Sequence, residues 1–216
     1  MKFKYSMIFI ILISFFMHST AWAEEVKEEK GIILIDPGHG GIDGGSKSKN
    51  GTVEKDINLS IALKLKKALD NEGYNTFLTR EDDTELSKSK VKDLTIRCDM
   101  KKETNCDIFI SIHQNKFPKE SCFGAQVWYA DNDNSLNFAK ILQESLRKNV
   151  DNKNKRLEKP AKKQYKILRD GYDGASVILE CGFLSNTNEE QKLKSDDYQE
   201  KIVYAIVQGI NEYMKK

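Results

Sequence analysis

Two stretches of strand length in this sequence are almost entirely apolar, and they limit the fold more than any other feature. Residues 31–36 read Gly-Ile-Ile-Leu-Ile-Asp, and residues 107–113 read Asp-Ile-Phe-Ile-Ser-Ile-His. A strand with one face in water alternates apolar and polar residues, whereas these stretches are typical of strands buried on both faces. Such strands occur mainly in parallel sheets whose two faces are covered by helices. The sequence therefore predicts a central parallel sheet.

Helical patterns alternate with the strand patterns along the chain. Apolar residues repeat on one face of 54–71, and Gly73 can end that helix in the left-handed conformation. The other expected elements are strands at 74–79, 125–130 and 175–180, and helices at 92–104, from an N-cap at Ser135 and over 198–213. This alternation predicts βαβ units, and thus a single α/β domain: a mainly parallel, twisted sheet with helices on both faces. The Lys-rich stretch 153–166 is expected to be a solvated loop, with an anionic or glycan substrate as the alternative contact.

The first 23 residues have the parts of a secretory signal peptide. Lys2 and Lys4 precede the apolar run 6–17, and Ala21-Trp22-Ala23 is a small-x-small cleavage site. We expect cleavage there, followed by a linker at 24–30 and one domain over 31–216; an uncleaved signal would instead anchor the chain to a membrane. Loss of this segment removes two Lys and no acid, so the net charge falls from +2 to 0. An exported chain of zero net charge is not expected to bind nucleic acid through bulk charge.

The four cysteines are Cys98, Cys106, Cys122 and Cys181. In an exported protein they could form two disulfides in three connectivities, or remain free. None belongs to a Cys-x-x-Cys pair, so they are not expected to bind metal.

Four residues suited to metal or acid–base chemistry fall near predicted strand ends, where ligands bind in open α/β sheets. His39 follows the first strand, His113 and Glu180 close two later ones, and Glu54 begins the first helix. Two imidazoles and one carboxylate with an open fourth position form a catalytic zinc site, and a further carboxylate can act as general base. Each residue also has a simpler interpretation: a histidine at a strand end is often a hydrogen-bonded loop residue, and Glu54 complements the helix dipole. Glu180 is harder to dismiss, because a carboxylate directly after an apolar strand must be desolvated or paired.

Five short segments form an ordered series along the chain. They are 35–41 (Ile-Asp-Pro-Gly-His-Gly-Gly), 54–59 (Glu-Lys-Asp-Ile-Asn-Leu), 78–80 (Leu-Thr-Arg), 111–113 (Ser-Ile-His) and 179–186 (Leu-Glu-Cys-Gly-Phe-Leu-Ser-Asn). The series resembles the successive motifs of the zinc-dependent N-acetylmuramoyl-L-alanine amidases of type 3. This resemblance implies one Zn²⁺ per chain bound by His39, Glu54 and His113, with Glu180 as the catalytic carboxylate.

The resemblance also implies the reaction and its setting. The expected substrate is peptidoglycan, cut at the amide between the lactyl group of N-acetylmuramic acid and L-alanine. The compact form resembles the germination-specific amidases of endospore formers, which act in spore cortex on the way to muramic-δ-lactam. The expected location is then the cell wall or the forespore intermembrane space.

Three further expectations accompany this interpretation. Three ligands from separate loops hold metal weakly unless those loops are preorganised, so an activator protein that orders the site is a candidate partner. A catalytically silent peptidoglycan-binding scaffold or regulator is the alternative function. A polysaccharide deacetylase is a more distant alternative, because it would need an aspartate-rich set such as Asp36 and Asp43 around His39, and would leave Glu180 without a role.

Overall fold

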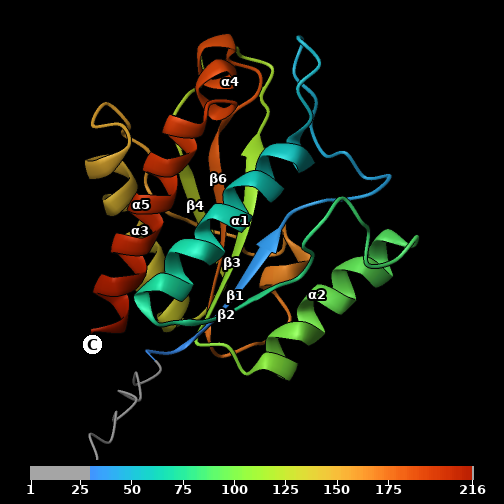
Figure 1. The fold of residues 1–216 in the computed structure, drawn as a ribbon, viewed down its shortest axis with the longest axis vertical. Coiled ribbons are helices and arrows are strands. Elements are labelled where there is room, and N and C mark those ends of the chain that lie inside the picture. Colours follow the sequence, from blue (N-terminus) through green and yellow to red (C-terminus); the bar gives the residue numbers. More distant parts are fainter. Residues whose placement is uncertain (1–29, 216) are drawn as a thin grey trace, which may run out of the picture.

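The computed structural model describes residues 30–215, in which six strands form one sheet (Figure 1). The predicted signal peptide 1–23 and residues 24–29 of the linker lie outside the described residues. The strands are β1 (Ile32–Pro37), β2 (Asn75–Leu78), β3 (Ile108–Asn115), β4 (Gln126–Tyr129), β5 (Lys159–Pro160) and β6 (Ala175–Phe183). The helices are α1 (Glu54–Glu72), α2 (Lys90–Thr104), α3 (Asp133–Asn149), α4 (Thr187–Leu193) and α5 (Asp196–Met214), with a 3-10 helix η1 at Lys166–Leu168.

The strand order in the sheet is β2-β1-β3-β6-β4-β5. β2, β1, β3 and β6 run parallel to one another, β4 is antiparallel to β6, and β5 is parallel to β4. The two apolar stretches form β1 and β3, which lie side by side, and every residue of β6 is buried. The prediction of a single α/β domain with a mainly parallel sheet is confirmed.

Helices cover both faces of the sheet, as predicted. Successive side chains of a strand point to opposite faces. Ile33 and Ile110 belong to the core under α1, α3 and α5, whereas Leu34 and Phe109 belong to the core under α2 and η1. In Figure 1, α1 and α5 cross the sheet on one side, and α2 lies apart from them. No helix within 30–215 is long and apolar enough to cross a membrane.

The predicted cap of α1 is confirmed, and the predicted cap of α3 is wrong. Gly73 has a φ of 93° and donates its backbone N–H to the last turn of α1. α3 is capped by Asn132, whose side chain accepts a hydrogen bond from the backbone N–H of Ser135 at 2.7 Å. Ser135 lies inside the helix because its hydroxyl is buried against β6, where it accepts the N–H of Ser176 at 2.8 Å.

Three short elements were not expected from the sequence, namely β5, η1 and α4. β5, which has two residues, lies within the Lys-rich stretch 153–166 and pairs with the end of β4. α4 has seven residues, too few to produce a helical repeat, and is capped by Asn186. The rest of the Lys-rich stretch is mainly loop, as predicted.

All four cysteines are free thiols, so the open choice between disulfides and free cysteines is settled as free. Cys98, Cys106 and Cys181 are buried and Cys122 is partly exposed. None of them belongs to a potential metal-binding group found among residues 30–215.

Candidate metal centre

The carboxyl ends of β1, β3 and β6 lie next to one another because the three strands are parallel and adjacent. His39 follows β1 by two residues, and His113 lies in the last part of β3. Glu180 is the register partner of His113 on β6. Glu54 is the first residue of α1, and the loop that follows β1 returns the chain to the same edge of the sheet. The topology therefore carries all four predicted site residues to one edge.

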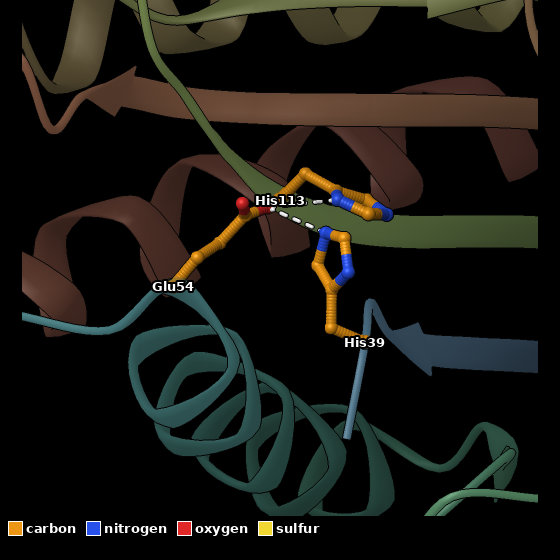
Figure 2. Close-up of side chains that lie close together, drawn as sticks. All are labelled: His39, Glu54 and His113. Carbon is orange, nitrogen blue, oxygen red and sulfur yellow. Dashed lines mark hydrogen bonds and ion pairs between the residues drawn. The ribbon is translucent and has the colours of Figure 1, made fainter. Parts of the chain in front are cut away.

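His39, Glu54 and His113 form a group whose donor atoms lie within 4.8 Å of one another. His39 Nε2 lies 3.2 Å from Glu54 Oε1, and His113 Nδ1 lies 2.9 Å from the same oxygen. Figure 2 shows both rings directed at the Glu54 carboxylate from different elements. Three donor atoms from three segments thus face one small volume.

The carboxylate of Glu54 is held by backbone as well as by the two rings. Ser46 donates its N–H to Oε2 at 2.7 Å, and Gln114 donates its N–H to Oε1 at 3.0 Å. Burial raises the pKa of Glu54, but the two imidazoles, His113 more than His39, lower it well below its ordinary value. Glu54 also occupies the first turn of α1, so its expected role at the helix dipole holds beside its place in the group.

His39 has a φ of 64°, an uncommon conformation for a residue with a side chain. Two guanidinium groups hold its backbone carbonyl: Arg80 Nε at 2.7 Å and Arg97 Nη2 at 3.0 Å. The second ring nitrogen, Nδ1, lies 3.1 Å from Asp43 Oδ2, which fixes the orientation of the ring. Burial lowers the pKa of His39, but the carboxylates of Glu54 and Asp43 raise it above its ordinary value.

A buried ion pair lies behind the His39 loop. Arg97 Nη1 lies 2.5 Å from Asp36 Oδ1, and Asp36 also accepts the hydroxyls of Thr79 at 2.6 Å and Ser111 at 2.5 Å. Burial alone would raise the pKa of Asp36, but Arg97 and the two hydroxyls lower it to about 2. Asp36 is therefore committed to Arg97, and the aspartate-rich ligand set of a deacetylase is not formed.

Glu180 lies beside the group of His39, Glu54 and His113. Its Oε2 is buried and accepts no hydrogen bond in the described part of the chain. Burial raises the pKa of Glu180 to about 7, with Glu54 adding to the rise and the two histidines opposing it. Glu180 lines the same pocket as His39, Glu54 and His113, together with Tyr165. A buried carboxylate with a free oxygen beside a metal-binding group is a suitable general base.

Two glycines leave room for the rings and bear on whether the group fits a metal ion. A Cβ built on Gly45 would lie 2.6 Å from the His39 ring and 2.7 Å from Glu54 Oε2. A Cβ built on Gly38 would lie 2.3 Å from the His113 ring. Two imidazole nitrogens and one carboxylate oxygen are ligands that first-row divalent metals accept, with positions left open. The group therefore fits a bound metal ion.

The structure brings the four residues named from the sequence to one end of the sheet, but the sequence did not indicate the groups that hold them. Arg80 belongs to the 78–80 motif and Arg97 lies outside all five motifs, yet both bind the carbonyl of His39. Asp43 was considered only as a ligand of a deacetylase, whereas it contacts the far side of the His39 ring. The one available signal was Asp36, a charge at the end of an apolar strand, which requires a partner.

Comparisons with known proteins agree on one family. Residues 33–212 match the family described as N-acetylmuramoyl-L-alanine amidase. The germination-specific N-acetylmuramoyl-L-alanine amidase of Bacillus subtilis is 34% identical over 195 residues, which cover 84% of this chain and 79% of that protein. The probable cell wall amidase LytH of Staphylococcus aureus is 32% identical over 200 residues, 88% of this chain and 62% of that protein. The CwlD amidase from Clostridioides difficile, solved in complex with the GerS lipoprotein, has a TM-score of 0.81 and 40% identity, covering 86% of this chain and 98% of that one.

Proposed function

The chain belongs to the N-acetylmuramoyl-L-alanine amidase family and is a hydrolase, and from this premise we propose that it uses Zn²⁺ to cleave the amide between the lactyl group of N-acetylmuramic acid and L-alanine in peptidoglycan. The observation that carries the proposal is that His39 Nε2 and His113 Nδ1 both face Glu54 Oε1. Two histidines and one carboxylate with an open position are typical of catalytic zinc.

In this proposal each residue has a distinct task. Zinc, when bound by His39, Glu54 and His113, supplies Lewis acidity that polarises the amide carbonyl and acidifies water. Glu180 accepts the proton of the attacking water as the new carbon–oxygen bond forms. As the carbon–nitrogen bond breaks, Glu180 donates that proton to the leaving amine of alanine. Asp43 keeps the His39 ring in the orientation that presents Nε2 to the metal.

The test of the assignment is Glu180→Gln beside His113→Ala. Glutamine keeps the size of the side chain but cannot accept and return a proton, so we expect Glu180→Gln to bind zinc like wild type and to lose at least about a hundredfold in activity. His113→Ala should lose both zinc and activity. Purified spore and vegetative peptidoglycan would be incubated with each protein, with and without zinc, and the products identified by mass spectrometry. Normal release of stem peptides by Glu180→Gln would refute its role, and loss of acetyl groups instead would indicate a deacetylase.

We further propose that the chain is exported by the segment 1–23 and acts in spore cortex, on the path to muramic-δ-lactam. The similarity to the germination-specific amidase of Bacillus subtilis supports this setting. We also propose an activator protein as partner, supported by the complex of the similar CwlD amidase with the GerS lipoprotein. Spores that lack this protein should contain no muramic-δ-lactam, and normal δ-lactam in them would exclude the cortex role.

A further inference from the structure

A second pocket, here called the basic pocket, lies outside the catalytic centre. It is formed by the β3–β4 loop and the segment that follows α3. Its lining residues are Lys119, Ser121, Cys122, Phe123, Lys153, Asn154, Lys155 and Arg156. Four of the eight are cationic, and no Asp or Glu lines this pocket among residues 30–215. The predicted mature chain has no net charge, so the cationic side chains of this pocket form a local positive patch on a chain that is neutral as a whole.

The three lysines of the basic pocket are exposed and available. The ammonium groups of Lys119, Lys153 and Lys155 pair with no side chain in the described part of the chain. Phe123 adds an apolar surface that is 43% exposed. The pocket therefore offers three free cations beside an aromatic ring, a combination suited to a ligand with several anionic groups and apolar parts between them.

The walls of the basic pocket are held by contacts within the chain. Asn154 is buried and donates to the carbonyl of Ala125 at 2.8 Å. Arg156 donates to the carbonyl of Phe123 at 2.7 Å and lies 4.4 Å from the centre of the Phe183 ring. Arg147 in turn holds the carbonyls of Asn154 and Arg156, each at 3.0 Å. These contacts fix the backbone of both walls, so little order has to be gained when a ligand binds.

The basic pocket is joined to the catalytic centre by the β3–β4 loop. Lys116 lines the catalytic pocket, and Lys119 follows it by three residues, a reach of at most about 11 Å between Cα atoms. The loop is tied to the segment after Glu180, because Phe117 donates its N–H to Ser185 Oγ at 3.1 Å and Asn186 donates to the carbonyl of Cys122 at 3.3 Å. A polymer held at the catalytic centre can therefore reach the basic pocket.

We propose that the basic pocket binds a carboxylate-bearing stem peptide of peptidoglycan, next to the one being cut. The choice of ligand rests on the proposed function, because the substrate polymer carries acidic peptides at regular intervals. Three lysines complement their carboxylates, and the Phe123 ring packs against their methyl and methylene groups. Binding there holds the polymer while the catalytic centre acts on the neighbouring amide.

The test compares the full chain with a triple variant, Lys119→Gln, Lys153→Gln and Lys155→Gln. Lys67→Gln, Lys102→Gln and Lys201→Gln form the matched control, because they remove the same charge from exposed sites elsewhere. Cosedimentation with peptidoglycan sacculi freed of other wall polymers is measured with chelator present, so that binding does not depend on turnover. We expect about tenfold weaker binding for the triple variant and no change for the control, with the difference lost at about 0.5 M salt. Turnover of a soluble single-repeat muramyl peptide should be unchanged in both variants.

Competition identifies the ligand chemistry. Free stem peptide should release wild-type protein from sacculi, and the same peptide with esterified carboxylates should not. Unchanged binding of the triple variant, equal losses in variant and control, or equal competition by the esterified peptide would each overturn the proposal. Because these readouts need no catalysis, a failure of the proposed function would be visible separately, as absent peptide release by wild type.

Discussion

Replacing Arg97 with methionine tests how much the buried ion pair behind the His39 loop contributes to the stability of the fold. The side chains of Arg97 and Asp36 are 3% and 1% exposed, and Arg97 Nη1 lies 2.5 Å from Asp36 Oδ1. The substitution leaves the buried carboxylate with only the hydroxyls of Thr79 and Ser111. Removing one partner of a buried pair destabilises a protein by about 3–5 kcal/mol. We therefore expect Arg97→Met to lose about 4 kcal/mol of unfolding free energy at pH 7.

The pH dependence of the unfolding free energy tests the same prediction independently. In wild type the pKa of Asp36 is about 2, below its unfolded value of 3.8, so Asp36 contributes stability above pH 3.8 that is lost as the pH falls toward 2. This lowering of the Asp36 pKa corresponds to about 2 kcal/mol of unfolding free energy. In Arg97→Met, burial is the dominant effect on Asp36, and we expect its pKa in the folded state to rise above 3.8. Protonation of Asp36 in acid then removes the unpaired buried charge and stabilises the variant. The stability gap between wild type and Arg97→Met should narrow as the pH falls from 7 toward 4.

The assay is urea unfolding followed by circular dichroism at several pH values, with chelator present so that bound metal does not stabilise either protein. Lys30→Met is the control, because the Lys30–Glu72 pair is exposed and should contribute less than about 1 kcal/mol. The double variant Asp36→Asn with Arg97→Met should recover part of the loss, since the buried charge is gone. A loss below about 1 kcal/mol at pH 7, or a gap that widens in acid, would refute the reasoning.

Two shorter predictions concern the ligand loop and the thiols. Gly45→Ala should keep the fold but bind zinc at least about tenfold more weakly by calorimetric titration, because φ is 68° there and the new Cβ would meet the His39 ring at 2.6 Å; wild-type affinity would contradict this. Iodoacetamide should label one thiol, Cys122, in the native protein and all four after denaturation, because burial raises the pKa of Cys98, Cys106 and Cys181; rapid native labelling of a second thiol would show that the buried face opens.

The sequence was sufficient for the sheet because burial on both faces leaves a direct trace in the apolar runs 32–35 of β1 and 108–110 of β3. It was also sufficient for the end of α1, where Gly73 adopts the left-handed conformation that glycine favours. The cap of α3 was assigned to Ser135 instead of Asn132, because both residues are good caps and only burial against β6 distinguishes them. β5, η1 and α4 were missed, since elements of two, three and seven residues carry no periodic signal.

The residues of the candidate site also form two groups, those whose position the sequence indicates and those whose position it does not. His39, His113 and Glu180 could be placed at one edge because strand ends in a parallel sheet converge, whatever the loops do. The partners of the site could not be placed, because Arg80 and Arg97 are distant from His39 in sequence and meet it only through tertiary packing. Nor does any local pattern show that Asp43 turns back to the His39 ring.

The need for an activator was inferred from three ligands on separate loops, and the hydrogen bonds of the structure bear on what such a partner would do. The carbonyl of His39 is held by Arg80 and Arg97, and the carboxylate of Glu54 is held by the N–H groups of Ser46 and Gln114. These contacts position the backbone of His39 and the carboxylate of Glu54 from within the protein itself. Ile42, in contrast, is 90% exposed and lines a pocket together with His39. The structure thus separates an outer apolar side chain, Ile42, from metal-facing groups that are already hydrogen-bonded within the chain.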